Sequence, residues 1–187
     1  MDILFLTYRL RRRFWKIISS LWYAKFFKSF GNGSVIAKPV QIRGSKNISI
    51  GNKVLIRPYS WLYAYDGTNS NREMLTFGNN IQIGHFAHIA AINRVIIEDN
   101  VLIADKVYIS DHNHEFGKNI GMVGSKAISK GPVIIRKNCW IGEGVCILEG
   151  VEIGEGSVIG ANSVVTKSIP AKSVAVGSPA RVINHIG

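Results

Sequence analysis

The residues best suited to chemistry form one short run, Asp111-His112-Asn113-His114. An imidazole changes its charge close to neutral pH, so His112 or His114 could take a proton from a substrate and return it. Asp111 or Glu115 could orient the imidazole, and so could a backbone carbonyl. A zinc site would need a third and a fourth ligand, which the neighbouring sequence does not supply, so no metal is expected. The alternative is that both histidines are ordinary polar loop residues.

A six-residue repeat must position this run. From residue 135 onward an aliphatic residue recurs at every sixth position, and a small or apolar residue follows each one by four. A hexad is too short for a helix and its turn, but it holds one short strand and a bend, and hexapeptide repeats build parallel β-helices. One aliphatic side chain per hexad then stacks on its equivalent in the next coil. The first row is Ile135, Ile141, Ile147, Ile153, Ile159 and Val165; the second is Cys139, Val145, Val151, Ser157, Ser163 and Ile169.

Less regular hexads precede this run and divide the chain into three predicted parts. Residues 1–33 form a helical extension, 34–170 the β-helix and 171–187 a tail. Within the β-helix the periodicity is lost at about 66–76 and 111–131, which predicts two loops that leave the coil. The Asp-His-Asn-His run stands at the root of the second loop, and loop roots on a rigid scaffold are where working residues concentrate.

The first thirty residues differ from the rest in charge and pattern. They hold seven cations and one acid, a net charge of +6 (7 − 1), interleaved with aromatic and aliphatic residues and without glycine or proline. This composition predicts one or two helices. A basic, aromatic-rich helix without a run of eighteen apolar residues fits peripheral contact with a membrane surface. The alternative is a helix packed on the first coil, with its cations in solvent.

The composition of the whole chain limits which partners and which cellular compartment are expected. A formal charge of +11 over 187 residues calls for an anionic partner or surface. Nucleic acid is not expected, because there is no zinc-finger spacing, aromatic RNA-binding signature or helix-turn-helix pattern. The two cysteines imply no disulfide framework and the N-terminus lacks a signal-peptide pattern. We therefore expect a cytoplasmic protein, with peripheral contact at the inner face of the membrane as an option.

The hexads and the closing segment Val176–Ile183 resemble the hexapeptide-repeat, left-handed β-helix acyltransferases, over about residues 34–184. The Asp-His-Asn-His run and the segment Trp61–Asp66 make the chain most similar to sugar O-acetyltransferases, such as galactoside and maltose acetyltransferases and proteins of O-antigen and capsule assembly. The resemblance implies an all-β solenoid, a left-handed parallel β-helix with an N-terminal α-helical extension and an excursion loop. It also implies a homotrimer that uses acetyl-CoA.

The same resemblance suggests a role for each candidate site residue. His112 aligns with the family's general base, and His114 is the second choice. His88 falls near the family's acceptor-binding asparagine, a role that Asn93 could take instead, and Asp111 would also contact the acceptor. The coenzyme A groove, closed by the tail, would be lined by Trp140, Gly142, Glu143, Ala161, Thr166, Lys167 and Arg181. Of these, the two cations would bind the phosphates through charge-assisted hydrogen bonds.

Three functions follow as hypotheses. The first is an acetyl-CoA-dependent O-acetyltransferase acting on a sugar hydroxyl in surface polysaccharide biosynthesis, with a sugar, a sugar nucleotide or a lipid-linked sugar as acceptor. The second is an N-acetyltransferase acting on an amino sugar or a nucleotide-linked amino sugar. The third is a non-catalytic β-helix that binds or scaffolds. Stabilisation by coenzyme A would separate the enzymes from the scaffold.

Overall fold

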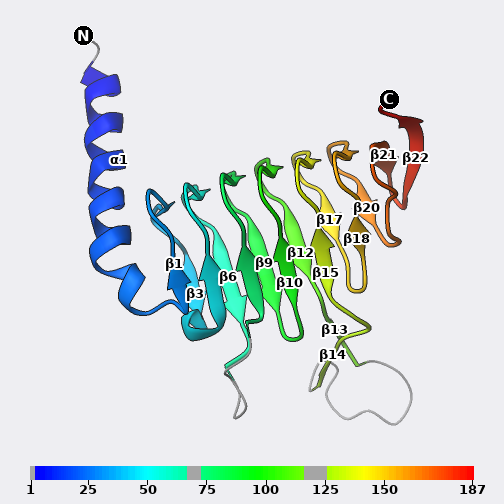
Figure 1. The fold of residues 1–187 in the computed structure, drawn as a ribbon, viewed down its shortest axis with the longest axis horizontal. Helices are drawn as coiled ribbons and strands as arrows, with labels where there is room; N and C mark the ends of the chain where they lie inside the picture. Colours follow the sequence, from blue (N-terminus) through cyan, green and yellow to red (C-terminus); the bar gives the residue numbers. More distant parts are fainter. Residues whose placement is uncertain (1–2, 67–72, 116–125) are drawn as a thin grey trace.

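The computed structural model describes residues 3–66, 73–115 and 126–187, and it consists of one long helix followed by a solenoid of short strands (Figure 1). The helix, α1, spans Ile3–Leu21, and the 3-10 turn η1 (Tyr23–Lys25) leads from it into the first coil. A second 3-10 turn, η2, spans Ser45–Asn47. No helix in the described ranges is long and apolar enough to cross a membrane.

Three parallel sheets form the sides of the solenoid, and each coil contributes one strand to each sheet. Sheet A contains β1 (Ser29–Phe30), β4 (Ile48–Ile50), β7 (Leu75–Phe77), β10 (Val95–Ile97), β15 (Val133–Ile135) and β18 (Glu152–Ile153). Sheet B contains β2 (Val35–Ile36), β5 (Leu55–Ile56), β8 (Gln82–Ile83), β11 (Leu102–Ile103), β16 (Trp140–Ile141), β19 (Val158–Ile159), β21 (Ser173–Gly177) and β22 (Ala180–His185). Sheet C contains β3 (Gln41–Arg43), β6 (Trp61–Ala64), β9 (His88–Ala91), β12 (Tyr108–Ser110), β17 (Cys146–Ile147) and β20 (Val164–Val165).

This arrangement is the predicted left-handed parallel β-helix with a helical extension. Its strands are only a few residues long because the chain must turn after each one, and pairing between coils supplies the backbone hydrogen bonds that so short a strand cannot supply alone. The last strand, β22, is the exception: it pairs antiparallel with β21 and so ends sheet B without a further coil.

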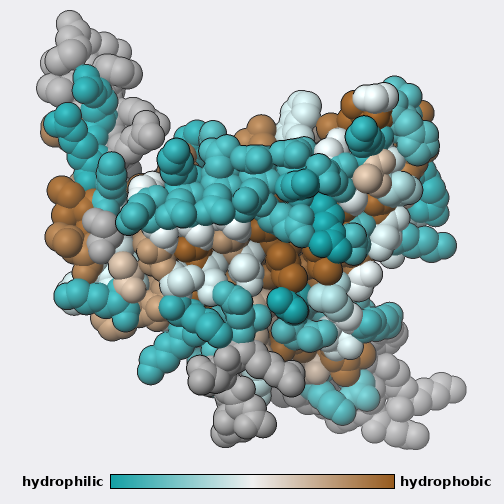
Figure 2. Space-filling view, in the orientation of Figure 1, coloured by the Kyte–Doolittle hydropathy of each residue, from teal (hydrophilic) through white to brown (hydrophobic). Residues whose placement is uncertain are grey.

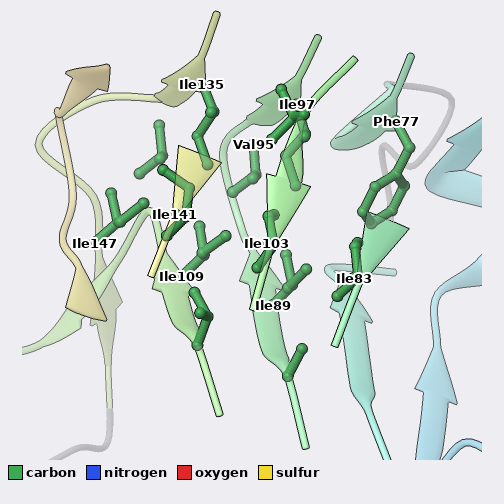
Figure 3. Packing of buried hydrophobic residues seen from close by; sticks show 14 of the residues in the cluster. Phe77, Ile83, Ile89, Val95, Ile97, Ile103, Ile109, Ile135, Ile141 and Ile147 are labelled. Carbon is green, nitrogen blue, oxygen red and sulfur yellow. The ribbon is translucent and has the colours of Figure 1, made fainter. Parts of the chain in front are cut away.

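Stacked aliphatic side chains fill the interior. In sheet B, Ile103 lies opposite Ile83 on one side and Ile141 on the other, and Ile141 lies opposite Ile159 in the next coil. All four side chains are buried, and Figure 3 shows such residues from successive coils converging on the axis of the solenoid. The second row of the repeat, from Cys139 to Ile169, is buried as well. The removal of this apolar surface from water is the main favourable contribution to the free energy that holds the coils together.

The ends of the solenoid differ in detail from the three predicted parts. β1 pairs in parallel with β4 and so belongs to the first coil, although it lies ahead of residue 34. The segment 171–187 contains β21 and β22, so it continues sheet B. The two predicted loops lie partly outside the described residues, at 67–72 and 116–125. At the root of the second loop, β13 (Asn113–His114) pairs antiparallel with β14 (Ala127–Ile128).

The two adjacent residues of β11, Leu102 and Ile103, provide a matched test of the core. Ile103 points inward and is 1% exposed, whereas Leu102 points outward and is 45% exposed. Ile103→Ala should lower the free energy of unfolding by about 2–5 kcal/mol, because it leaves a cavity between two coils. Leu102→Ala should change it by no more than about 0.5 kcal/mol. Urea denaturation measures both, and equal losses would contradict the assignment of the inward row.

Candidate active site

The site forms where the chain leaves sheet C after β12 and turns toward sheet A. Tyr108 and Ile109 of β12 lie opposite His88 and Ile89 of β9, and β12 ends at Ser110. Asp111 and His112 follow directly and lead into β13. Because parallel strands on both sides fix β12, the two residues start from a rigid edge at the point where the chain leaves the coil.

Asp111 connects two coils at this corner. Its side chain is fully buried, and its carboxylate accepts the backbone N–H groups of Ile92 (2.9 Å), Asn93 (2.8 Å) and Arg94 (2.6 Å) from the preceding coil. A buried carboxylate is tolerated only with such partners, and charge-assisted bonds of this kind are among the stronger ones in proteins. The side chain therefore serves the architecture of the corner and is not open to contact an acceptor in the single chain.

The same carboxylate orients His112. Nδ1 of His112 lies 3.1 Å from Oδ1 of Asp111 and 3.1 Å from Oγ of Ser110. The Ser110 hydroxyl donates to the backbone carbonyl of His112 at 2.9 Å, and the carboxylate can only accept, so we assign the ring proton to Nδ1. Nε2 then keeps its lone pair, which is the arrangement that a general base needs. The His112 side chain is 14% exposed, so its position is well defined by its surroundings.

His114 lies near His112 but is held differently. It is an exposed residue of β13, and its ring centre lies 6.2 Å from that of His112, with the two rings nearly perpendicular. Its backbone N–H donates a hydrogen bond to the side-chain oxygen of Asn113 at 2.8 Å. Among the contacts of the described residues there is no carboxylate at its ring. Of the two histidines, His112 therefore has the geometry of an oriented base.

His88 faces the same region from the outer surface of sheet C. Its ring centre lies 4.1 Å from that of Trp61 and 5.0 Å from that of Tyr108, so it is enclosed between neighbours on β6 and β12. Burial lowers the pKa of His88, and the charge that His112 carries whenever its ring is protonated lowers it further. His88 is therefore held toward its neutral form and can offer one donor and one acceptor.

Asn93 completes this group at the neighbouring corner. Asp111 fixes its backbone, and its exposed side-chain amide lies 3.5 Å from Oγ of Ser129, which follows β14. The structure thus brings His88, Asn93, Asp111, His112 and His114 together around one corner. Within the described ranges, no group of three His, Cys, Asp or Glu side chains is arranged to hold a metal ion.

The residues expected to line a cofactor groove lie further along the solenoid, in part at the corner between sheets B and C. Gly142 follows β16, and a Cβ at this position would lie 2.7 Å from the backbone nitrogen of Ala161 in the next coil, so only glycine allows this close stacking. Glu143 forms an ion pair with Lys106 at 2.8 Å. Trp140 projects from the outer face of sheet B and is 53% exposed.

The other predicted cofactor residues lie on different edges. Thr166 and Lys167 follow β20 at the corner from sheet C to sheet A, the corner that His112 occupies two coils earlier, a separation of roughly 10 Å. Arg181 lies on β22 opposite Val176, and its guanidinium donates to the Ala180 carbonyl at 2.9 Å. A single chain therefore does not gather Trp140, Gly142, Glu143, Ala161, Thr166, Lys167 and Arg181 into one cluster.

Two features of the site were missed by the sequence analysis. Ser110 supports His112, and Trp61 and Tyr108 enclose His88. The sequence did contain a signal for the aromatic neighbours. Trp61, His88 and Tyr108 each directly precede an inward aliphatic residue, which is Leu62, Ile89 and Ile109 respectively. The strand register places such residues on adjacent positions of the outer face.

Comparison with known proteins agrees with this architecture. Residues 132–167 match the family described as bacterial transferase hexapeptide (six repeats). The putative lipopolysaccharide biosynthesis O-acetyl transferase WbbJ of Escherichia coli (strain K12) is 33% identical over 166 residues, which cover 83% of this chain and 82% of WbbJ.

Two solved structures extend the comparison. Galactoside acetyltransferase in complex with coenzyme A has a TM-score of 0.64 and 35% identity, covering 75% of this chain and 66% of that one. AntD, an N-acyltransferase from Bacillus cereus in complex with dTDP and 3-hydroxybutyryl-CoA, has a TM-score of 0.76 and 26% identity. The match covers 87% of this chain and 85% of the AntD chain. The repeats, the solenoid and the relatedness to WbbJ together show that the chain belongs to the bacterial hexapeptide-repeat acyltransferases.

Proposed function

We propose that the protein is an acetyl-CoA-dependent O-acetyltransferase in which His112 is the general base. The observation that carries this proposal is the contact of its Nδ1 with the buried Asp111 carboxylate, which leaves Nε2 as the proton acceptor. Asp111 acts as a positioning residue, because its own oxygens are occupied by backbone N–H groups. Ser110 supports the same orientation from the other side of the ring.

The proposed reaction is a single acyl transfer. Nε2 of His112 takes the proton from the acceptor hydroxyl while the oxygen bonds to the carbonyl carbon of the thioester. The carbon–sulfur bond then breaks, and the leaving thiolate receives the proton from His112, so that the imidazole is neutral again. Asp111 stabilises the imidazolium that exists between the two proton transfers.

For the acceptor we propose a sugar hydroxyl of a surface polysaccharide or of its precursor. Support comes from the similarity to WbbJ, whose description is "putative lipopolysaccharide biosynthesis O-acetyl transferase". His88 and Asn93 would contact the acceptor, since both lie beside His112 with polar groups available. A nucleotide-linked amino sugar is the second candidate, because AntD is an N-acyltransferase solved with dTDP. His112 would then take the proton from an amine instead of a hydroxyl.

For the donor we propose that coenzyme A binds along the last coils. Lys167 and Arg181 would bind its phosphates, the Gly142–Ala161 corner would accept the pantetheine arm, and Thr166, Trp140 and Glu143 would border the groove. Because one chain leaves these residues on separate edges, we propose that a neighbouring copy completes the groove in a homotrimer. Support comes from the complexes of galactoside acetyltransferase and AntD with coenzyme A or an acyl derivative.

The direct test is release of free thiol from acetyl-CoA against a panel of sugars, sugar nucleotides and amino sugars. Release that depends on a sugar without an amine would support the O-transferase, and release only with amino sugars would favour the second candidate. If no acceptor supports turnover and coenzyme A does not stabilise the protein against heat, the proposal is wrong.

His112→Ala should lower kcat by about 10²–10⁴-fold, which is the usual contribution of a general base. It should leave coenzyme A affinity unchanged, because no phosphate contact is removed. His85→Ala is the matched control, since His85 is a second histidine beside a carboxylate, Asp105, at 3.3 Å, but on a different corner. Equal activity of the His112 variant and the wild type would transfer the role to His114.

Lys167→Gln should weaken coenzyme A binding by about tenfold to hundredfold, the usual loss for one charge-assisted bond. Titration calorimetry measures the affinity, and the rise of Tm with coenzyme A gives an independent estimate. Lys172→Gln is the control, because Lys172 is another exposed lysine near the end of the solenoid. If the two variants lose affinity equally, Lys167 has no specific role.

Proton NMR titration of His88 tests whether the two histidines share one site. In His112→Gln the pKa of His88 should rise, because the positive charge that opposes its protonation is gone. It should still stay below the ordinary value of 6.5, because burial remains. His114→Gln serves as the comparison. A pKa of His88 that is unchanged in the His112 variant would contradict the coupling.

A further inference from the structure

The helix α1 is attached to the solenoid through one face. Ser19 is fully buried, and its hydroxyl accepts the backbone N–H of Ile36 at 2.9 Å and donates to the carbonyl of Ile36 at 3.3 Å. These contacts join the helix to β2 in the first coil. In Figure 1, α1 lies across the N-terminal end of the solenoid and extends beyond it.

The opposite face of α1 carries a stripe of large apolar side chains in solvent. Leu10, Phe14, Ile17 and Leu21 are 54%, 56%, 56% and 65% exposed. Their spacing of four, three and four residues places them on one line along the helix. Ser19 is two residues from both Ile17 and Leu21, and at about 100° per residue this puts the stripe on the side that faces away from the solenoid. Figure 2 shows hydrophobic side chains at this outer edge of α1.

A stripe of cations runs beside the apolar one. Arg9, Arg13 and Lys16 are exposed, and their spacing of four and three residues places them on one flank of the helix. The sequence of α1 contains no acidic residue. Three cations along one flank give this side of the helix a positive potential, which attracts an anionic surface.

The aromatic content continues past the end of the helix. Trp22 and Phe26 are 63% and 50% exposed, and their ring centres lie 5.8 Å apart. Lys25, beside them, is exposed as well. Tryptophan and lysine at the border of an apolar stripe are typical of segments that lie at the boundary between lipid head groups and acyl chains.

We infer that α1 and η1 form a docking surface for a membrane that contains anionic lipid. The helix would lie in the plane of the surface, with the apolar stripe among the acyl chains and the cations at the head groups. Pairing of two copies through the same face would bring together two cationic flanks of a helix whose sequence has no acidic residue, and like charges repel. The charge complementarity therefore favours lipid over a second copy.

This surface bears on the proposed function. In sheet C, β12 lies three strand spacings from β3, so His112 would stand roughly 15 Å from the first coil. A protein held by α1 would present this corner at a short distance from the bilayer, within reach of an acceptor sugar carried on a lipid. This consequence depends on the acetyltransferase proposal, whereas lipid binding itself does not.

Co-sedimentation with vesicles tests the inference on the full chain. The wild type should bind vesicles of phosphatidylcholine mixed with phosphatidylglycerol, bind pure phosphatidylcholine far more weakly, and lose affinity as salt is added. Arg9→Gln with Arg13→Gln and Lys16→Gln should weaken binding roughly a hundredfold, at about fivefold for each cation. Phe14→Ser with Leu21→Ser should weaken it at least about tenfold by removing the apolar contact.

The matched control is the triple variant Lys46→Gln, Lys53→Gln and Lys126→Gln, whose lysines are exposed on the solenoid. Both triple variants lower the formal charge from +11 to +8 (11 − 3), so only the position of the charges differs. The control should bind like the wild type, and unchanged circular dichroism would show that every variant is folded. The inference is overturned if the wild type does not bind mixed vesicles, or if the control loses as much affinity as the helix variants. It is also overturned if the apolar variant changes only the oligomeric state, which would make the stripe an interface between copies.

Discussion

The stacking of each inward aliphatic side chain on its equivalent in the next coil is the interaction on which the rest of the structure depends. Short strands such as β8, β11 and β16 cannot persist alone, and each is fixed by the register in which Ile83, Ile103 and Ile141 lie opposite one another. The stack sets a regular distance between successive coils, and equivalent corners of the solenoid are therefore separated by the same distance. Polar residues at the corners are thereby placed by apolar residues that never contact a substrate.

The corner at Asp111 shows how this scaffold is used. The carboxylate belongs to one coil, while the backbone groups of Ile92, Asn93 and Arg94 that it binds belong to the coil before. The position of the His112 ring consequently depends on two stacked coils and not on the conformation of the loop that follows. Removing the carboxylate would leave three partly buried N–H groups without their acceptor, which is costly.

The sequence predicted the repeating parts of the fold and only some of the site. The rows from Ile135 to Val165 were predictable because a strict period leaves one way to bury them. The corners were harder to predict, because ten described residues other than glycine, among them Asn138 and Asn162, have positive φ, a conformation that glycine adopts most readily. The orientation of His112 by Asp111 was foreseen as one option, but Ser110 was not, because a serine at a strand end has many uses. The residues of the predicted cofactor groove lie on separate edges of one chain, and no local pattern could reveal that.

The helix across the first coil has a consequence for assembly. A stack of similar coils has no intrinsic length, and among the described residues β1, β2 and β3 each have a parallel neighbour on one side only. Such edges are templates for adding another chain end to end, which would produce filaments. Ser19 of α1 occupies the backbone groups of Ile36 at this end, and the antiparallel β22 closes sheet B at the other. The two terminal segments thus cover both ends of sheet B, which opposes the addition of a further coil there.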